Sequence, residues 1–214
     1  MSELKKAKYL GGMGAILVAL STASFLIFEP AFFISYRKKL LALIAPIFGF
    51  ALLLLAVQRI TNVVGEKKLC QNLILALGIG ILSLFILIFT APILGFKLAS
   101  LAASIPFLMA AIFLAQTFKE LGKITKGKYF SWTGSLFLVS GVWLVFESLV
   151  KLFIHVYSMI SPVISSPFLV MISFCHFNLI SFLLWTLGFL LLAIAFFTLP
   201  ENLLQKSSTE KKEV

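Results

Sequence analysis

Six long apolar stretches, separated by short polar connections, dominate the hydrophobic pattern of the chain. They occupy residues 9–28, 40–57, 73–89, 98–115, 133–150 and 168–199. Each has at least the roughly 17 residues that a helix needs to cross a hydrocarbon core about 30 Å thick. None has the period-two alternation of a membrane barrel strand, and lipid-exposed backbone must satisfy its own hydrogen bonds. The pattern predicts an all-α bundle of six transmembrane helices.

The polar segments define the rest of the organisation. Only residues 116–132 and the tail at 200–214 are clearly polar, so the pattern predicts one membrane domain over residues 1–199. The tail lacks a core-forming run, and we expect it to be disordered.

Composition supports lipid as the main solvent. The chain is 61% hydrophobic and 12% charged, whereas a soluble domain has about 25% charged residues. This balance argues against a disordered chain, a nucleic-acid-binding protein and a water-soluble enzyme. It favours a multi-pass protein of the cell (plasma) membrane.

The positive charges predict the orientation. Lysine and arginine total 18 against 8 acidic residues, all of them glutamate, and the net charge is +10. If the N-terminus is cytoplasmic, 13 of the 18 cations fall on the inside and 5 on the outside. This bias predicts that both termini are cytoplasmic, although Arg37, Lys38 and Lys39 oppose it. Topology accounts for the charge, so no nucleic-acid partner is needed.

Catalytic motifs are absent from the sequence. There is no glycine-rich phosphate loop, HExxH, CxxC or GxSxG, and the chain has no aspartate and only two histidines. Nucleophilic catalysis needs histidine or carboxylate partners. The sequence therefore predicts a protein that is not an enzyme and holds no cofactor and no metal.

One polar cluster falls within the apolar spans. Glu147 lies about 22 Å along the fifth span, and an ionisable group at that depth is costly unless it is paired. Lys151 and His155 follow on the same helical face, and His176 in the sixth span comes to the same depth as His155. Both histidines and Cys175 would then lie near the outer interface. The five residues fit a proton relay, a transition-metal site or the mouth of a solute path. They equally fit a neutralised Glu–Lys pair with two interfacial histidines.

Small residues recur every four positions in the first span, at Gly11, Ala15, Ala19 and Ala23. Such a stripe lets another helix approach closely. It predicts a helix-packing face, used either within the bundle or for dimerisation.

Several stretches together resemble one family: KAKYLGGMGAIL, LLLLAVQRITNVVGEKKLCQNLILALGIGIL, FKELGKITKGKYFSWTGSLFLVSG and LGFLLLAIAFFTLP. They are similar to the archaeal and bacterial integral membrane proteins catalogued as domain of unknown function 996. The resemblance covers nearly the whole chain and is most specific at residues 118–134. It implies a small prokaryotic multi-span membrane protein and supplies no functional residues.

The sparse polar inventory favours a non-enzymatic accessory or interaction component, with the lipid bilayer around it and a membrane protein or a second copy as partner. The rival interpretation is a small solute or ion transporter or channel that uses the Glu147 region.

Overall fold

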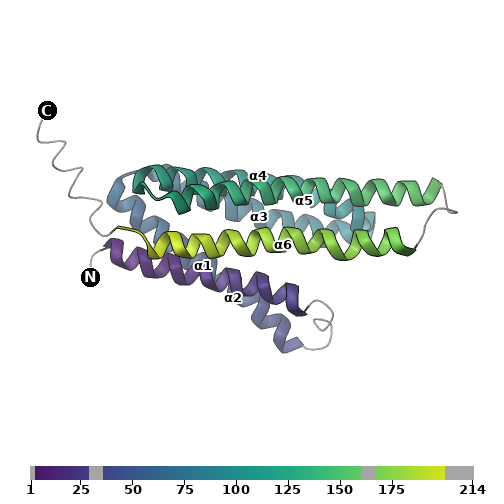
Figure 1. Ribbon diagram of the computed structural model, residues 1–214, viewed down its shortest axis with the longest axis horizontal. Helices are drawn as coiled ribbons and strands as arrows, with labels where there is room; N and C mark the ends of the chain where they lie inside the picture. The colour runs from purple at the N-terminus through teal and green to yellow at the C-terminus, as the bar shows by residue number, and fades with distance from the viewer. Residues whose placement is uncertain (1–2, 29–35, 161–166, 201–214) are drawn as a thin grey trace, which may run out of the picture.

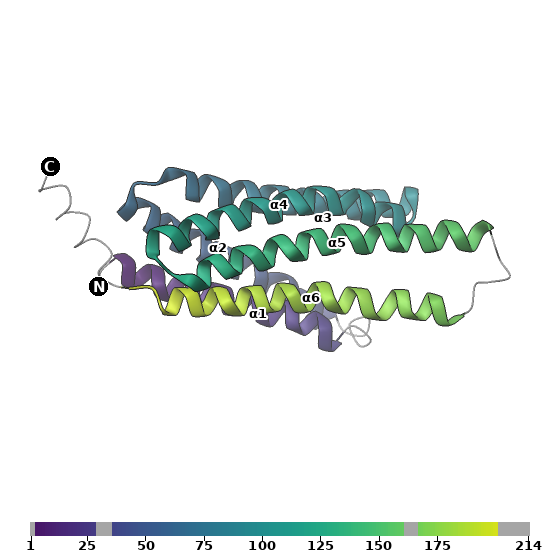
Figure 2. The same cartoon turned by 45° about the horizontal axis from the view of Figure 1, so that its top comes forward.

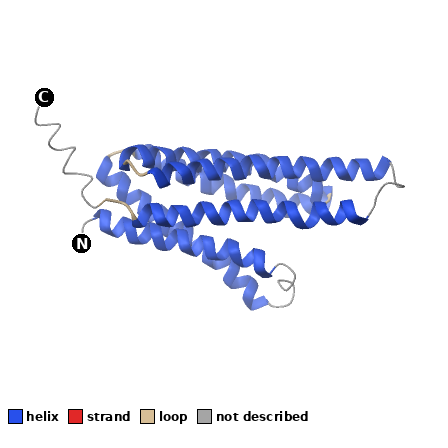
Figure 3. Cartoon of the chain, in the orientation of Figure 1, coloured by secondary structure: helices blue, strands red, loops and turns tan. Residues whose placement is uncertain are grey.

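Every element that the structure describes is an α-helix (Figure 3). This computed structural model describes residues 3–28, 36–160 and 167–200, and it leaves out the side chains at 24–28, 36–43, 96–97, 155, 158–160, 167–179 and 182. The helices are α1 (Glu3–Phe28), α2 (Tyr36–Val64), α3 (Lys67–Leu94), α4 (Phe96–Thr125), α5 (Lys128–Ile160) and α6 (Pro167–Phe197). The all-α prediction is confirmed. The tail prediction falls on 201–214, outside the described residues.

Four described helical stretches are long and apolar enough to cross a membrane: Ile44–Val64, Lys67–Leu94, Leu98–Thr125 and Lys128–Ile154. Leu183–Phe197 is a shorter apolar stretch. The chain is therefore helical and membrane-like in composition over these segments.

The helices extend beyond the apolar runs, and this corrects the predicted polar connection at 116–132. α4 continues to Thr125 and α5 begins at Lys128, so only two residues connect them. The polar stretch stays helical because Phe118 and Leu121 continue the buried face of α4. A hydrogen bond from the Thr125 hydroxyl to the Leu121 carbonyl, at 2.7 Å, lies in the last turn.

The six helices form a ring in chain order. Each packs on its neighbours in the sequence, α6 returns to α1, and the α2–α3 seam is the weakest of these contacts (Figures 1 and 2). The α1–α2 hairpin angles away from the other four helices toward its own connection (Figure 1). We call the opposite end, where α1, α3 and α5 begin and α2, α4 and α6 end, the lysine-rich end.

Glycines set the closest helix approaches. A methyl group on Gly14 of α1 would lie 2.6 Å from the Gly49 carbonyl oxygen of α2, and one on Gly134 of α5 would lie 2.7 Å from the Ala115 carbonyl oxygen of α4. Carbon and oxygen atoms do not pack that closely, so only glycine permits these crossings.

Hydroxyl groups link three of the helix pairs. Ser83 of α3 donates to the Ala103 carbonyl of α4 at 2.7 Å, and Thr186 of α6 donates to the Thr22 hydroxyl of α1 at 3.0 Å. The third link, between α6 and α5, belongs to the candidate site. Close packing and interhelical hydrogen bonds are the interactions that remain available to helices surrounded by lipid.

Candidate functional site

Glu147 is the buried charged residue at the centre of the candidate site. Its side chain, on α5, is 2% exposed. One carboxylate oxygen accepts a hydrogen bond from Lys151 Nζ at 2.5 Å, and the other accepts one from Ser181 Oγ at 2.8 Å. Both oxygens are thus engaged, which offsets the cost of removing the charge from water.

Lys151 closes the pair from one helical turn further along α5. Its side chain is 19% exposed, so the ammonium retains some access to solvent or headgroups while its stem covers the pair. Glutamate followed by lysine at i+4 is the favourable order on a helix. The pair is locally neutral, and its more exposed member, Lys151, lies on the side away from the lysine-rich end.

Ser181 joins α6 to the site by its hydrogen bond to Glu147. Both helices also carry small or polar residues at a spacing of seven. On α5, Thr133, Ser140 and Glu147 are all buried at steps of seven, and on α6 Ser181 and Gly188 repeat the same step. Two helices with small or polar residues at this spacing pack along a continuous seam. Ser181 was not among the residues predicted from the sequence, because its contact with Glu147 depends on the register between α5 and α6.

The other three predicted members of the cluster are only partly described. His155 lies in α5, and Cys175 and His176 lie in α6, but their side chains are outside the described residues. Within the part of the chain that is described, no three histidine, cysteine or acidic side chains gather where a metal ion could bind. The structure therefore brings together Glu147 and Lys151 of the five.

An aromatic cluster fills the bundle between Glu147 and the lysine-rich end. Phe137 of α5 has its ring centroid 4.9 Å from that of Phe189 and 5.0 Å from that of Trp185, both on α6. Phe50 of α2 and Phe118 of α4 complete its centre, at 5.6 Å from Phe189 and 5.8 Å from Phe137. These rings join four helices across the interior.

The aromatic cluster covers the site on one side, the side toward the lysine-rich end. Phe118, Phe137 and Phe189 are at most 1% exposed. Trp185 follows Ser181 by one helical turn, about 6 Å toward the lysine-rich end. A solute moving from Glu147 along the bundle in that direction would meet these buried rings, and protein interiors are close-packed.

The small-residue stripe on α1 lies at helix contacts within the chain. Gly11, Ala15 and Ala19 are buried and Ala23 is half-buried. A methyl group on Gly11 would lie 2.3 Å from the Phe196 ring of α6. The structure thus uses this face for packing inside the bundle.

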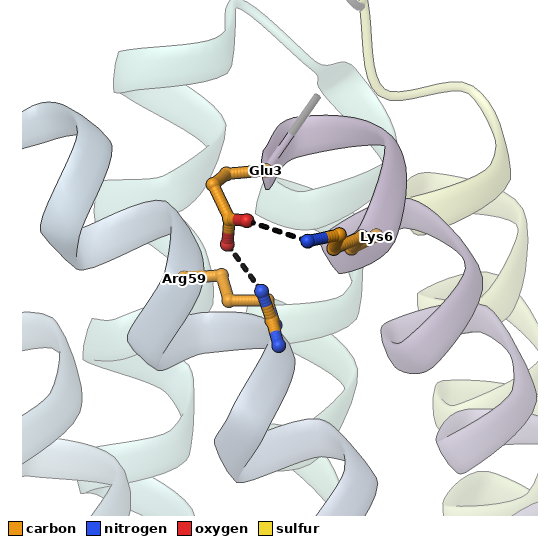
Figure 4. A network of polar contacts seen from close by, with 3 residues as sticks. All are labelled: Glu3, Lys6 and Arg59. Carbon is orange, nitrogen blue, oxygen red and sulfur yellow. Dashed lines mark hydrogen bonds and ion pairs between the residues drawn. The ribbon is translucent and has the colours of Figure 1, made fainter. Parts of the chain in front are cut away.

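A second polar site joins α1 to α2 at the lysine-rich end (Figure 4). Glu3 accepts a hydrogen bond from Lys6 Nζ at 2.9 Å and another from the Arg59 guanidinium. Hydrogen bonds from Lys6 and then Arg59 hold the pKa of the Glu3 carboxyl below its usual range. Arg59 lies 56 residues from Glu3, so no local spacing in the sequence indicated this contact.

Comparisons with protein-family models, with curated proteins and with solved structures found no match to this chain. The resemblance to the family of unknown function stays a prediction, and the site must be interpreted from its own geometry.

Proposed function

We propose that this chain is a multi-pass protein of the cell membrane in which all six helices cross the bilayer and both termini are cytoplasmic. The uneven distribution of lysine and arginine supports this orientation. Four helices already meet the length and composition of a span within their described residues. Impermeant thiol labelling of Lys126→Cys and Lys39→Cys in whole cells tests it, each in a chain whose native Cys70 and Cys175 are changed to serine. Only the second should react from outside, and labelling of the first would contradict the topology.

We further propose that it serves as a non-enzymatic accessory component that binds another membrane protein or a second copy of itself. The observation that carries this proposal is the packed interior on one side of Glu147: the aromatic cluster lies between Glu147 and the lysine-rich end, and both oxygens of Glu147 are engaged. A bundle packed in this way leaves its outer faces as the surfaces for partners.

Site-specific photocrosslinking in native membranes tests the accessory role. α3 is the least buried of the four long apolar helices, so a photoreactive residue at Phe85 should yield a discrete protein adduct. The same residue at Phe146, equally exposed on α5, is the control. Lipid adducts alone at Phe85, together with a single-chain mass in mild detergent, would refute the proposal.

A small transporter remains the second candidate because Glu147 is buried within a helix apolar enough to span a membrane. Intramembrane ionisable residues often mark solute or proton routes. Proteoliposome flux compares the native chain with Glu147→Gln, and Glu120→Gln removes an exposed carboxylate as the control. Flux that disappears only in Glu147→Gln would establish transport and displace the accessory role.

A further inference from the structure

We propose that the lysine-rich end carries a binding face for the headgroups of anionic phospholipids. We call it the lysine face, and it comprises Lys67, Lys68, Lys119, Lys123, Lys126 and Lys128. The inference rests on the proposed membrane insertion and goes beyond the accessory role, because it names lipid phosphate as a specific ligand class.

Helix register brings these residues to one end of the bundle. The Ser83–Ala103 hydrogen bond marks a crossing of the antiparallel helices α3 and α4. Lys67 precedes Ser83 by 16 residues and Lys119 follows Ala103 by 16, so both lie about 24 Å from that crossing in the same direction.

The α4–α5 turn adds the remaining lysines. Lys126 occupies it with a left-handed backbone, and Lys128 begins α5 directly after it. A methyl group on Gly134 of α5 would lie 3.1 Å from the Lys119 side chain, so Lys119 runs along α5 as well. The lysine face therefore spans the adjoining ends of three helices.

The face is accessible and carries an excess of positive charge. All six lysines except the half-buried Lys119 are exposed. Glu66 and Glu120 lie among them, and Glu120 is already paired with Lys123 at 2.7 Å. Six lysines against two glutamates leave four net positive charges on this part of the described chain.

At the starts of α3 and α5, the helix dipole disfavours the lysine charges and favours a bound anion. Lys67 and Lys68 lie in the first turn of α3, and Lys128 is the first residue of α5; neither first turn contains an acidic residue. The positive end of a helix dipole disfavours cations and attracts anions, and its free N–H groups bind phosphate. Glu66, which precedes α3, makes no capping hydrogen bond with its side chain. A phosphate beside these helix starts would neutralise both the dipoles and the lysines.

Exposed aromatic side chains place this face at the level of lipid headgroups. Trp132 is 57% exposed and Tyr129 is 39% exposed, and their rings meet edge to face at a centroid distance of 6.0 Å. Tryptophan and tyrosine are enriched at membrane interfaces because they combine an apolar body with a polar tip. Trp132 lies about 6 Å further along α5 than Lys128, so the lysines would be level with the phosphates. This position favours lipid over a soluble acidic protein or nucleic acid.

Fluorescence quenching of Trp132 by brominated lipids tests the proposal, in a chain carrying Trp143→Phe and Trp185→Phe so that one tryptophan reports. Brominated phosphatidylglycerol should quench more effectively than brominated phosphatidylcholine. In Lys67→Gln/Lys68→Gln/Lys128→Gln this preference should fall at least about fivefold, the weight of a single lysine near an anionic surface. High salt should reduce it as well.

Thermal stabilisation of the unmodified chain by added phosphatidylglycerol provides a second readout that needs no tryptophan substitution.

Removing an equal charge elsewhere is the matched control. Arg37→Gln/Lys38→Gln/Lys39→Gln changes the first turn of α2, at the other end of the bundle, and should leave the signal at Trp132 unchanged. An unchanged preference in the lysine-face variant, or an equal loss in the control, overturns the proposal. Loss of the preference on adding soluble glycerol phosphate, when sodium chloride at the same ionic strength leaves it intact, overturns the assignment to lipid. Alkaline extraction of the chain from the vesicles would instead overturn membrane insertion itself.

Discussion

Replacing Lys151 by methionine should destabilise the bundle by about 3 kcal/mol, because it leaves Glu147 charged and buried without its cation. We take the lower end of the range for broken buried pairs since Lys151 is itself 19% exposed, whereas Glu147 is 2% exposed. Ser181 would remain as a hydrogen-bond donor, but a hydroxyl cannot neutralise a carboxylate.

A double-mutant cycle isolates the pair from the other contacts of Lys151. In Glu147→Gln/Lys151→Met the charge is gone and the glutamine oxygen still accepts from Ser181, so the free energy of unfolding should return to within about 1 kcal/mol of native. The measurement is reversible unfolding in mixed micelles, followed by circular dichroism.

An exposed ion pair of the same type serves as the control. Lys123 and Glu120 are paired at 2.7 Å, with side chains 73% and 49% exposed, so Lys123→Met should cost less than about 1 kcal/mol. A Lys151→Met variant as stable as Lys123→Met, or a double variant no more stable than Lys151→Met, would refute the argument from burial.

Three further predictions concern packing and charge elsewhere in the bundle. Gly14→Leu should prevent the close α1–α2 crossing and cost at least about 1–3 kcal/mol of unfolding free energy, whereas Gly78→Leu, where an added methyl group meets no atom within 4 Å, should cost nothing. Phe137→Ala should cost about 3–5 kcal/mol in the same unfolding assay, because the ring is fully buried in the aromatic cluster. Arg59→Gln should raise the pKa of Glu3 toward the ordinary carboxyl value, as followed by the carbon-13 shift of its carboxyl group against pH.

The sign of the Glu3 effect follows from its lowered pKa. The carboxylate favours the folded contact above the ordinary carboxyl pKa, and that contribution is lost as the pH falls through the lowered value. Contact between the two helices should therefore persist at neutral pH and loosen only in acid. A pKa that does not move in Arg59→Gln would contradict the assignment of this ion pair, and an unfolding free energy for Gly14→Leu equal to that for Gly78→Leu would contradict the close crossing.

Hydrophobic pattern alone was sufficient to predict the helices but not where they end. An apolar run contains only residues that lipid or the bundle interior can cover. The span predicted from it therefore ended at residue 115, before the end of α4. The helix continues to Thr125 because Phe118 and Leu121 stay buried while Gln116, Glu120 and Lys123 lie on the exposed face.

In the candidate site, the contact within one helix could be predicted from sequence, but the contact between helices could not. Helical spacing places Lys151 beside Glu147, since residues four apart share a face. Ser181 lies 34 residues from Glu147 and depends on the register between α5 and α6, which no spacing within one helix determines. The aromatic cluster is also a product of four helices, and from sequence its phenylalanines could not be distinguished from those facing lipid.

The return of α6 to α1 has a consequence for biogenesis. The chain leaves the ribosome with α1 first, so α1 can pack on α2 early but lacks its second neighbour, α6, until that helix has been made. Because the α2–α3 contact is weak, the α1–α2 hairpin can stay separate from α3, α4 and α5 until α6 has been made. Coexpressing residues 1–65 and 66–214 as two polypeptides should reconstitute the complete assembly, because α6 in the second fragment supplies the surface that recruits the first.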